Sequence, residues 1–338
     1  TGPEWRSTNG LTQSNISNLK TQWNINIFRL CFNREDYLNN ANGVRDKIKN
    51  IATWCKDLGI VLILDHQWEW YDGGTVWLPD KQSTINLWNN ISQDSVFKNN
   101  SYVWFDIWNE PHDCTIAQWR DISNACVQKI RDNGANNICL VAGINWASTI
   151  KPWQGNYLPQ SNVVYSCHVY YGGGPTSDLD NNIGLVLKDG KDVFIGETAP
   201  YWDEPFTSSQ VNWFQNTLLP WLDGNNRGSG IPTTKIGFAA WAISSLASAS
   251  TLTDNDFITP TDPYGKIVKN KLLETPTITP TPPTITPTPP TITPTPPTIT
   301  PTPPTITPTP PTITPTPPTI TPTPPTITPT PPTITPTP

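Results

Sequence analysis

The chain has 338 residues, with 27 acidic and 21 basic side chains and a formal net charge of −6. This balance, without a basic cluster, argues against a nucleic acid or an anionic membrane surface as a partner. No apolar run reaches the roughly 18 residues that a membrane-spanning helix needs, so no membrane segment is expected.

Short β-branched or aromatic runs alternate with longer polar stretches along residues 1–274. The runs predict strands at 25–31, 60–66, 102–109, 137–143, 163–170, 192–197 and 235–241. The polar stretches predict helices at 12–22, 41–57, 84–98, 115–132, 178–188 and 207–222. Such alternation indicates an α/β fold with a parallel sheet, and this length favours a (β/α)8 TIM barrel. An open sheet is disfavoured because no GxGxxG turn follows an early strand.

The strand count is one short of a complete barrel. A helix-like segment precedes the first strand, so the missing strand should come before it, where only TGPEWRSTNG remains. We therefore expect residues 1–274 to form a catalytic barrel that lacks strand 1.

Residues 275–338 have a different composition from the rest of the chain. From Thr277 the unit TITPTPP occurs eight times and then stops at TITPTP, with no charge, aromatic residue or glycine. Prolines at this density exclude a helix, so we expect a disordered, polyproline-like linker. Such Thr/Pro tracts are candidates for O-glycosylation, and together with sequons at Asn15, Asn90 and Asn99 they favour a secreted protein. A carbohydrate-binding module is a candidate partner of the barrel at the far end of the linker.

The six cysteines are too sparse for a disulfide scaffold in a domain of this size. No CxxC pair is present, so we expect no zinc site. No metal and no organic cofactor is implied by the rest of the sequence. Cys31, Cys139 and Cys167 lie in apolar runs, where a free cysteine is usually a small buried hydrophobe.

Polar side chains gather at the carboxyl ends of the predicted strands. Side chains two residues apart share one face of a strand. Five rows result from this rule: Leu62, Leu64 and His66; Trp104, Asp106, Trp108 and Glu110; Val164, Ser166, His168 and Tyr170; Val193, Ile195 and Glu197; and Gly237, Ala239 and Trp241. All three histidines, including His112, fall at or just past such ends. In a parallel barrel this end carries the chemistry.

Two glutamates, Glu110 and Glu197, end two of these rows. A pair of carboxyl groups in a tryptophan-rich cleft suits cleavage of a glycosidic bond, because one can protonate the leaving oxygen while the other attacks the anomeric carbon. The alternative is structural: each glutamate could cap the following helix or pair with a cation such as Arg29.

Three motifs in this order resemble glycoside hydrolase family 5, the cellulase family. They are IWNEPH around Glu110, CHVYY around His168 and FIGET around Glu197, and the resemblance covers roughly residues 20–245. It implies that Glu110 is the general acid/base and Glu197 the nucleophile. It also implies that Asn109 holds the sugar 2-hydroxyl and that Arg29 supports the nucleophile as an anion. The chain departs from the usual family pattern after Glu197, where it reads Thr-Ala-Pro.

The remaining substrate contacts are expected around these two glutamates. By resemblance, His66, His168, Tyr170 and Trp241 line the cleavage point, with Trp241 under the sugar. Trp68 and Trp146 add flat rings after strand ends, together with Trp153, Tyr171 and Trp202. Such rings can stack on pyranose faces, although ordinary loop packing would also place them there.

The sequence thus predicts a monomeric, secreted, retaining endo-β-1,4-glucanase that acts on a polysaccharide. Two alternatives stay open. A mannanase or another β-glycanase would keep the chemistry and change the sugar. A non-catalytic sugar-binding wall protein would account for the tryptophans and the Thr/Pro tract, but not for two glutamates beside Asn109.

Overall fold

The computed structural model describes residues 11–68, 77–171, 174–202, 205–243, 250–254 and 256–274, without the side chain of Trp68. The predicted linker at 275–338 lies outside these residues. Within the described part of the chain, no helix is long and apolar enough to cross a membrane.

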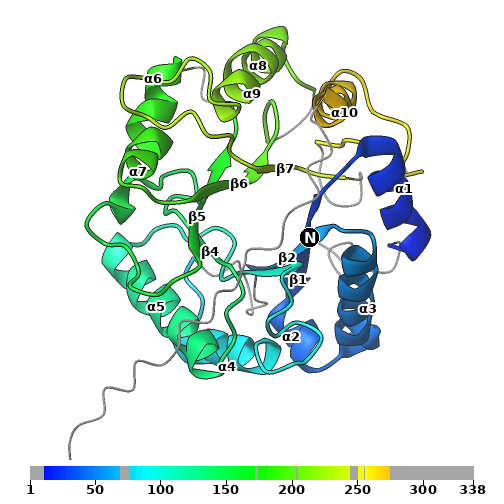
Figure 1. Cartoon of the computed structure of the whole chain (residues 1–338), viewed down its shortest axis with the longest axis vertical. Helices are drawn as coiled ribbons and strands as arrows, with labels where there is room; N and C mark the ends of the chain where they lie inside the picture. Colours follow the sequence, from blue (N-terminus) through cyan, green and yellow to red (C-terminus); the bar gives the residue numbers. More distant parts are fainter. Residues whose placement is uncertain are drawn as a thin grey trace, which may run out of the picture. The chain divides into compact units, whose positions relative to one another are not determined.

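Seven parallel strands form one sheet in the order of the chain, from β1 to β7. Their bounds are β1 Ile27–Asn33, β2 Val61–Trp68, β3 Val103–Asp106, β4 Cys139–Ala142, β5 Val163–Val169, β6 Val193–Thr198 and β7 Phe238–Ala240. The sheet curls into a nearly closed barrel surrounded by helices (Figure 1). The predicted strands and their parallel order are confirmed, and β1 and β7 are the two edge strands of the described sheet.

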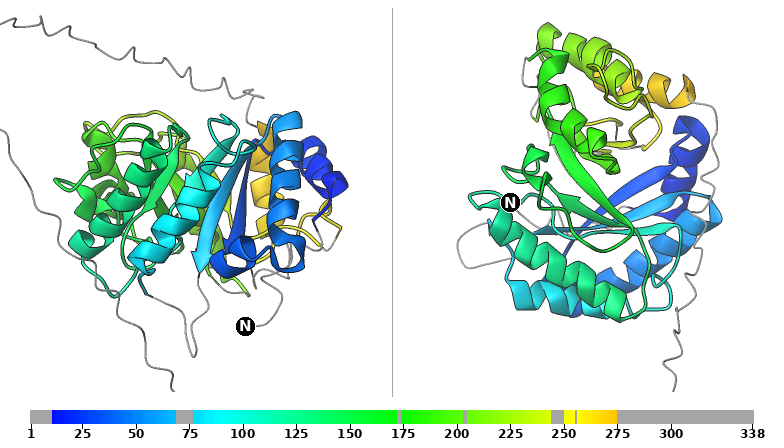
Figure 2. Two further views of the ribbon diagram at one scale, coloured as in Figure 1. Left: turned by 90° about the horizontal axis from the view of Figure 1, so that it is seen from below. Right: turned by 60° about the vertical axis from the view of Figure 1, so that its left-hand side comes forward.

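An outer ring of helices covers the sheet (Figure 2). The α-helices are α1 Gln13–Trp23, α2 Arg34–Leu38, α3 Val44–Asp57, α4 Lys81–Ile91, α5 Ile116–Asp132, α6 Thr176–Leu179, α7 Leu185–Lys188, α8 Ser208–Trp213, α9 Leu219–Leu222 and α10 Tyr264–Glu274. The 3₁₀-helices are η3 Ala41–Gly43 and η4 Lys151–Trp153, and the π-helical turns are η5 Asp180–Gly184 and η6 Phe214–Leu218.

Three helices, α1, α5 and α8, have a threonine as their N-cap residue. The Thr12, Thr115 and Thr207 side chains each accept a hydrogen bond from the backbone three residues on, and the residue there bonds back to the cap. These capping boxes satisfy backbone N–H groups that a helix start leaves free. The predicted helix at 84–98 is misplaced, because Asp80 caps α4 and starts it at Lys81. The sequence reasoning missed α2 and α10.

Helix α10 packs against α1, on the side of the barrel where β1 and β7 are the edges (Figure 1). The Asn24 side chain donates to the backbone oxygen of Leu272, and the Lys269 ammonium lies over the Trp23 ring. The ring of helices is therefore continuous across the sheet edges, even though no strand pairing joins β1 to β7 among the described residues.

The lower barrel interior is filled by apolar side chains. Ile63, Leu140 and Phe194 come from β2, β4 and β6, which is the alternating contribution that packs a barrel in layers. Trp104 of β3 meets Phe194 of β6 edge to face, with ring centroids 6.1 Å apart, so this contact crosses the barrel.

For two of the five predicted rows of side chains, those of β2 and β6, the assignment to the barrel interior is wrong at least in part. In β2 the side chains that face the interior are Ile63 and Asp65, whereas Leu62 and Leu64 pack outward into the main core under the helices. In β6 the register shifts between β5 and β6, so that Cys167 pairs with Ile195 and His168 pairs with Glu197. Phe194 and Glu197 thus both face inward, although they differ in parity.

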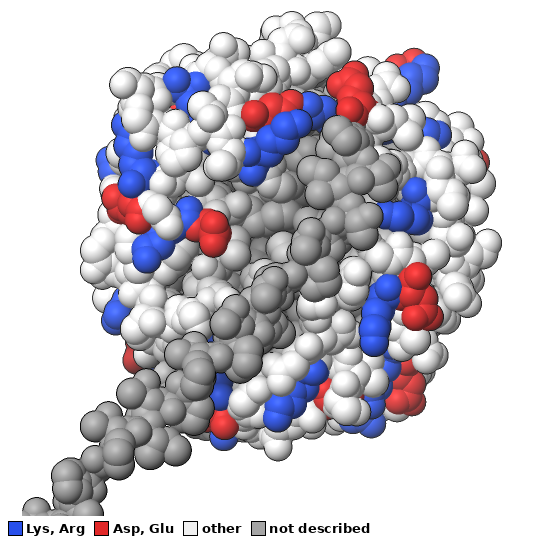
Figure 3. Space-filling view, viewed as in Figure 1, with Lys and Arg blue, Asp and Glu red and all other residues white. Residues whose placement is uncertain are grey.

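One face of the molecule carries charged side chains of both signs. On the face seen in Figure 3, Lys and Arg side chains are interspersed with Asp and Glu. Among the described residues of this face, the cations form no patch of the kind that binds nucleic acid.

Candidate active site

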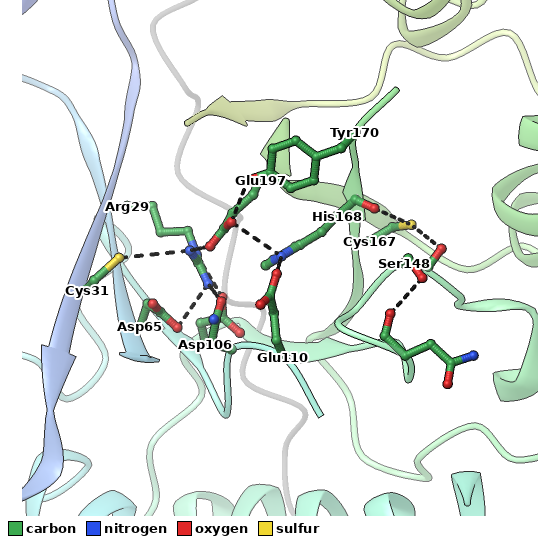
Figure 4. Close-up of polar contacts among 12 residues, drawn as sticks. Arg29, Cys31, Asp65, Asp106, Glu110, Ser148, Cys167, His168, Tyr170 and Glu197 are labelled. Carbon is green, nitrogen blue, oxygen red and sulfur yellow. Dashed lines mark hydrogen bonds and ion pairs between the residues drawn. The ribbon is translucent and has the colours of Figure 1, made fainter. Parts of the chain in front are cut away.

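Arg29 of β1 is the centre of a buried polar group at the carboxyl end of the strands (Figure 4). Its Nη1 donates to Glu197 Oε1 at 2.7 Å, its Nε to Asp106 Oδ2 at 3.0 Å, and its Nη2 to Asn109 Oδ1 at 2.7 Å. Burial alone would lower the pKa of Arg29, but Asp65, Asp106 and Glu197 together raise it well above its usual value. The guanidinium is therefore a permanent cation beside Glu197.

Glu197 is held on both carboxylate oxygens. Arg29 occupies Oε1, and the Tyr170 hydroxyl donates to Oε2 at 2.8 Å. Only 5% of its side-chain surface is exposed. Two donors, one of them cationic, stabilise the ionised form of a carboxyl group. Glu197 is thus a buried carboxyl group whose two oxygens are both fixed by hydrogen-bond donors.

Glu110 lies in a different environment, although it is close to Glu197. One of its carboxylate oxygens lies within 4.8 Å of a Glu197 oxygen. A hydrogen bond of 2.7 Å joins Oε1 to Nδ1 of His168, and 28% of the side chain is exposed to the cleft. Burial raises the pKa of Glu110 to about 7, against the opposing effect of Arg29 and His112. Glu110 can therefore hold a proton in weakly acidic solution.

His168 stands between the two glutamates. Its Nδ1 is 2.7 Å from Glu110 and 3.6 Å from Glu197 Oε2. Burial lowers the pKa of His168 to about 4, although Glu197 opposes this shift. At neutral pH the ring is uncharged, so it serves as a hydrogen-bonding partner rather than a second cation.

The bulge before Glu197 needs a residue without a side chain. A Cβ on Gly196 would come within 2.5 Å of Ser166 Oγ and 2.8 Å of His168 Nε2. The glycine therefore lets β6 approach β5 closely enough to aim Glu197 at the site. Proximity, rather than a positive φ, accounts for this glycine.

The structure places His66 away from the open cleft. Its ring is fully buried, stacked against Phe32 at 6.1 Å and edge to face with Trp108 at 4.6 Å. Burial lowers the pKa of His66 to about 3, so the ring is neutral. Its backbone oxygen accepts a hydrogen bond from the Asn109 N–H, which joins β2 to the loop that carries Asn109 and Glu110.

Asp65 and Asp106 belong to the site, and sequence reasoning did not assign them a role. Asp65 Oδ1 is 3.0 Å from Arg29 Nη2, and Asp106 contacts Nε of the same guanidinium. The signal that could have found Asp65 was its carboxylate at a strand end, directly before His66.

An open cleft of about 750 Å³ lies beside Glu110. Its walls include Glu110, Trp146, His168, Tyr170 and Trp202. Trp146 and Trp202 expose 53% and 60% of their surface, so both rings are available to a ligand. By contrast, Trp153 is fully buried and bonds the backbone oxygen of Ala142, which makes it a core residue and corrects its proposed stacking role.

A strip of aromatic rings extends from the Glu110 side of the cleft. The Trp146 ring is stacked on His112 at 4.3 Å with an interplanar angle of 10°, and Trp77 lies 6.4 Å from His112. Backbone hydrogen bonds hold the three loops together, from His112 to Trp77 and from Trp146 to Pro111. Trp77 is 59% exposed, so the strip has two open indole rings.

Two expected tryptophans are less fully described. Trp241 directly follows β7, and its backbone N–H donates to the oxygen of Thr198, next to Glu197. Its backbone oxygen accepts from the Tyr264 hydroxyl. Trp68 ends β2, but its side chain and residues 69–76 of the following loop lie outside the described residues.

The cysteines carry no disulfide. All six are free thiols, and Cys139 and Cys167 are buried, as expected for small hydrophobes. Cys31 is partly exposed and lies beside Arg29, with Sγ 4.0 Å from Nη1.

Glu110, His168 and Glu197 are also close enough to one another to be considered as metal ligands. Ligand atoms around a tetrahedral zinc ion with bonds of about 2.0 Å lie roughly 3.3 Å apart. The 2.7 Å between His168 Nδ1 and Glu110 Oε1 is shorter and fits a direct hydrogen bond. The geometry therefore favours a carboxyl pair over a metal centre.

Solved structures with the same architecture include cellulases and a β-glucanase. "Cellulase Cel5C_n" superposes with a TM-score of 0.67 at 22% identity, over 82% of this chain and 85% of its own. A β-glucanase of Saccharophagus degradans in complex with cellotetraose superposes with a TM-score of 0.66 at 18% identity, over 80% and 84%. At such identity the likeness establishes the fold, a barrel of the kind found in these hydrolases.

Sequence relatives agree with the fold. An endoglucanase of Clostridium saccharobutylicum is 24% identical over 74% of this chain and 53% of its own length. "Endoglucanase EG-II" of Hypocrea jecorina is 25% identical over 60% and 47%. The chain thus spans about half the length of the curated relatives it matches.

The family model described as cellulase (glycosyl hydrolase family 5) matches residues 2–244. The chain belongs to glycosyl hydrolase family 5, as the three motifs predicted.

Proposed function

We propose that this protein is a retaining endo-β-1,4-glucanase that cleaves cellulose or related β-glucans with Glu197 as nucleophile and Glu110 as acid/base. The observation that carries the proposal is the proximity of the two carboxyl groups, since one oxygen of Glu110 lies within 4.8 Å of one oxygen of Glu197. Retaining glycosidases hold their carboxyl groups about 5–5.5 Å apart, whereas inverting enzymes need about 6.5–9.5 Å to admit a water molecule.

The unlike surroundings of the two glutamates support their separate roles. Glu197 accepts hydrogen bonds from Arg29 and Tyr170, and a cation beside a carboxylate suits a nucleophile. Glu110 has a pKa raised to about 7 by burial, which suits a group that must give a proton and later take one back. Asn109, tied to Arg29, stands next to Glu110 and is suited to bind the sugar 2-hydroxyl.

Two displacements result from these roles. In the first, a Glu197 oxygen bonds to the anomeric carbon, the glycosidic C–O bond breaks, and the proton of Glu110 goes to the leaving oxygen. In the second, Glu110 removes a proton from water, whose oxygen attacks the anomeric carbon and releases Glu197. The Glu197 carboxylate loses its negative charge in the first displacement, so the hydrogen bond that Tyr170 donates to Oε2 becomes weaker. The bond regains its strength when the second displacement releases the carboxylate.

Substitution of each glutamate, followed by rescue with azide, tests the roles. Glu197→Ala should abolish turnover, and azide should restore activity with inversion at the anomeric carbon. Glu110→Ala should still form the intermediate from a dinitrophenyl glycoside, which needs no acid, and azide should then give a product with retention. Glu274→Ala, at the exposed end of α10, is the matched control and should match the wild type. If both site variants gave the same product stereochemistry, the roles would be withdrawn.

The open cleft and its exposed rings favour a polymer over a small glycoside. Trp146 and Trp202 stand on its wall, and Trp77 extends the aromatic surface beyond it. The mannanase alternative differs only in the sugar, and reducing-sugar release from carboxymethylcellulose against mannan separates the two. Binding without turnover on either polymer would favour the non-catalytic wall protein.

Secretion, a single-domain catalytic unit at 1–274 and a linker at 275–338 that leads to a carbohydrate-binding module complete the proposal. The Thr/Pro composition of the repeat supports the linker, since it has almost no apolar surface with which to pack. Sedimentation of the purified chain tests the expected monomer, and detection in culture medium tests secretion.

A further inference from the structure

Three carboxyl groups surround one guanidinium inside the barrel. Arg29 lies 3.0 Å from Asp65, 3.0 Å from Asp106 and 2.7 Å from Glu197 (Figure 4). The exposed side-chain fractions are 4% for Arg29, 0% for Asp65, 1% for Asp106 and 5% for Glu197. With all three carboxyl groups ionised, the group would carry one positive and three negative charges, a net −2. A buried excess charge is costly, and a carboxyl group in such a place usually takes up a proton.

Asp65 and Asp106 are neighbours in the sheet. They are direct register partners on β2 and β3, and adjacent strands lie about 4.8 Å apart. Each is two residues beyond an interior apolar side chain, Ile63 and Trp104 respectively, so both point into the barrel. Two carboxyl groups that face one cation at this spacing repel each other when both are charged, and such pairs hold one proton between them.

Hydrogen bonds indicate which carboxyl group is the neutral one. Glu197 accepts from Arg29 and Tyr170, and Asp106 accepts from Arg29 Nε. Among the described residues, the neighbours of the Asp65 carboxyl group are Arg29 Nη2, at 3.0 Å, and the Cys31 thiol, and neither makes a well-aligned hydrogen bond to it. Burial raises the pKa of Asp65 well above its usual range, despite the opposing charge of Arg29, and raises that of Asp106 to about 6.

We propose that Asp65 carries a proton in the folded protein and acts as a neutral positioning residue, which leaves the charge of Arg29 to Asp106 and Glu197. Its oxygen supports Nη2, the nitrogen that donates to Asn109. The titratable groups that face Asp65 are Arg29 and Cys31 from β1, Asp106 from β3 and Glu197 from β6. Cys31 is its register partner on β1 and supplies no positive charge.

The functional consequence rests on the proposed roles of Glu110 and Glu197. If all three carboxyl groups were ionised, they would compete for the single positive charge of Arg29. With Asp65 neutral, Glu197 keeps the shortest of the three contacts, and Asn109 keeps its orientation toward the substrate. Asp65 touches no reacting atom, so it acts only through Arg29.

Three variants of the full chain and one spectroscopic measurement test the proposal. Asp65→Asn reproduces a neutral carboxyl group in size and charge, so kcat and KM should stay within a few-fold of the wild type across the pH profile. Asp65→Ala leaves Nη2 without its neighbour, and the displaced guanidinium should reduce kcat about 100-fold, with a smaller change in KM. Asp106→Asn removes a charge that the proposal requires and should cost more than Asp65→Asn.

Infrared spectroscopy tests the proton directly. At about pH 9, above the pKa of about 7 of Glu110 and of about 6 of Asp106, the wild type should still show the C=O stretching band of a buried protonated carboxyl group. Asp65→Asn should lose that band, and a Glu274→Ala control should retain it. Equal damage from Asp65→Asn and Asp65→Ala, or a band that survives Asp65→Asn, would overturn the proposal. The band does not depend on turnover, so an active Glu197→Ala variant would refute the proposed function and leave the assignment of the proton standing. If Asp65→Ala does not fold, the band and the Asp65→Asn kinetics still decide.

Discussion

The raised pKa of Glu110 predicts that this residue lowers the stability of the protein in neutral and alkaline solution. Folding raises its pKa from 4.5 to about 7, mainly through burial. Between these values the folded chain binds more proton at Glu110 than the unfolded chain does, so the free energy of unfolding falls as the pH rises. Below pH 4.5 both states are protonated and the cost is absent; above pH 7 it is complete.

The size of the effect can be calculated from the shift. At about 1.4 kcal/mol for each pKa unit, a change from 4.5 to about 7 corresponds to roughly 3–4 kcal/mol. Because 28% of the side chain is exposed to water, solvent screening reduces this value, and we expect a destabilisation of about 2 kcal/mol. For a domain of this size, 1 kcal/mol moves Tm by about 2–4 °C.

Glu110→Gln is the matched perturbation, because its side-chain oxygen can keep the hydrogen bond to His168 while it cannot ionise. Denaturant unfolding of the wild type and the variant should be compared at several pH values from 4 to 8. The variant should gain about 2 kcal/mol relative to the wild type between the two ends, with most of the change between pH 5 and 7. Glu274→Gln is the control and should behave as the wild type does. Parallel curves for Glu110→Gln and the wild type would refute the buried, protonated state of Glu110.

Three further predictions concern the strand bulge, the aromatic strip and the linker. Gly196→Ala should reduce kcat strongly, because its Cβ would meet Ser166 Oγ at 2.5 Å; adding Ser166→Ala should restore part of the loss, and an unchanged rate in the single variant would contradict the close approach. Trp146→Ala should raise KM for a long β-glucan about 3- to 10-fold, the value of one aromatic contact, with little effect on a short aryl glycoside; equal effects on both substrates would argue against a distal subsite. Deletion of residues 275–338 should leave Tm and the rate on soluble substrate unchanged, and a loss of several degrees in a thermal melt would mean that the repeat packs on the barrel.

The barrel could be predicted because the alternation of runs along the chain and the local helix-capping signals indicate the same fold. Strand runs and polar stretches alternate, and Thr115 and Thr207 start their helices with local signals that do not depend on the rest of the fold. Helix α4 was misplaced because Asp80 is a cap only if the preceding loop presents it, and that loop has no periodic pattern. Helix α10 depends on its packing against α1, which is a tertiary effect.

The sequence predicted the two glutamates of the site, but it did not predict that Asp65 and Asp106 surround Arg29. Alternation along a strand identifies two faces, but only the closed barrel decides which face is inside. For β2 the deciding fact is that Ile63 packs with Leu140 and Phe194, which puts Asp65 beside Arg29 instead of under a helix. A sequence contains no direct record of such a contact across the barrel.

Register irregularities explain why parity fails where the chemistry is. The pairing of β1 with β2 shifts after Phe32, that of β5 with β6 shifts before His168, and that of β6 with β7 shifts between Ile195 and Thr198. Each shift lies near the carboxyl end of its strand, level with the polar group around Arg29. A bulge turns side chains of both parities to one face, so β6 can supply Phe194 to the apolar layer and Glu197 to the layer above it. Strands without a bulge could fill the apolar part of the barrel equally well, but Glu197 would then face the helices. Gly196 permits the close approach of β5 and β6 that turns Glu197 into the barrel.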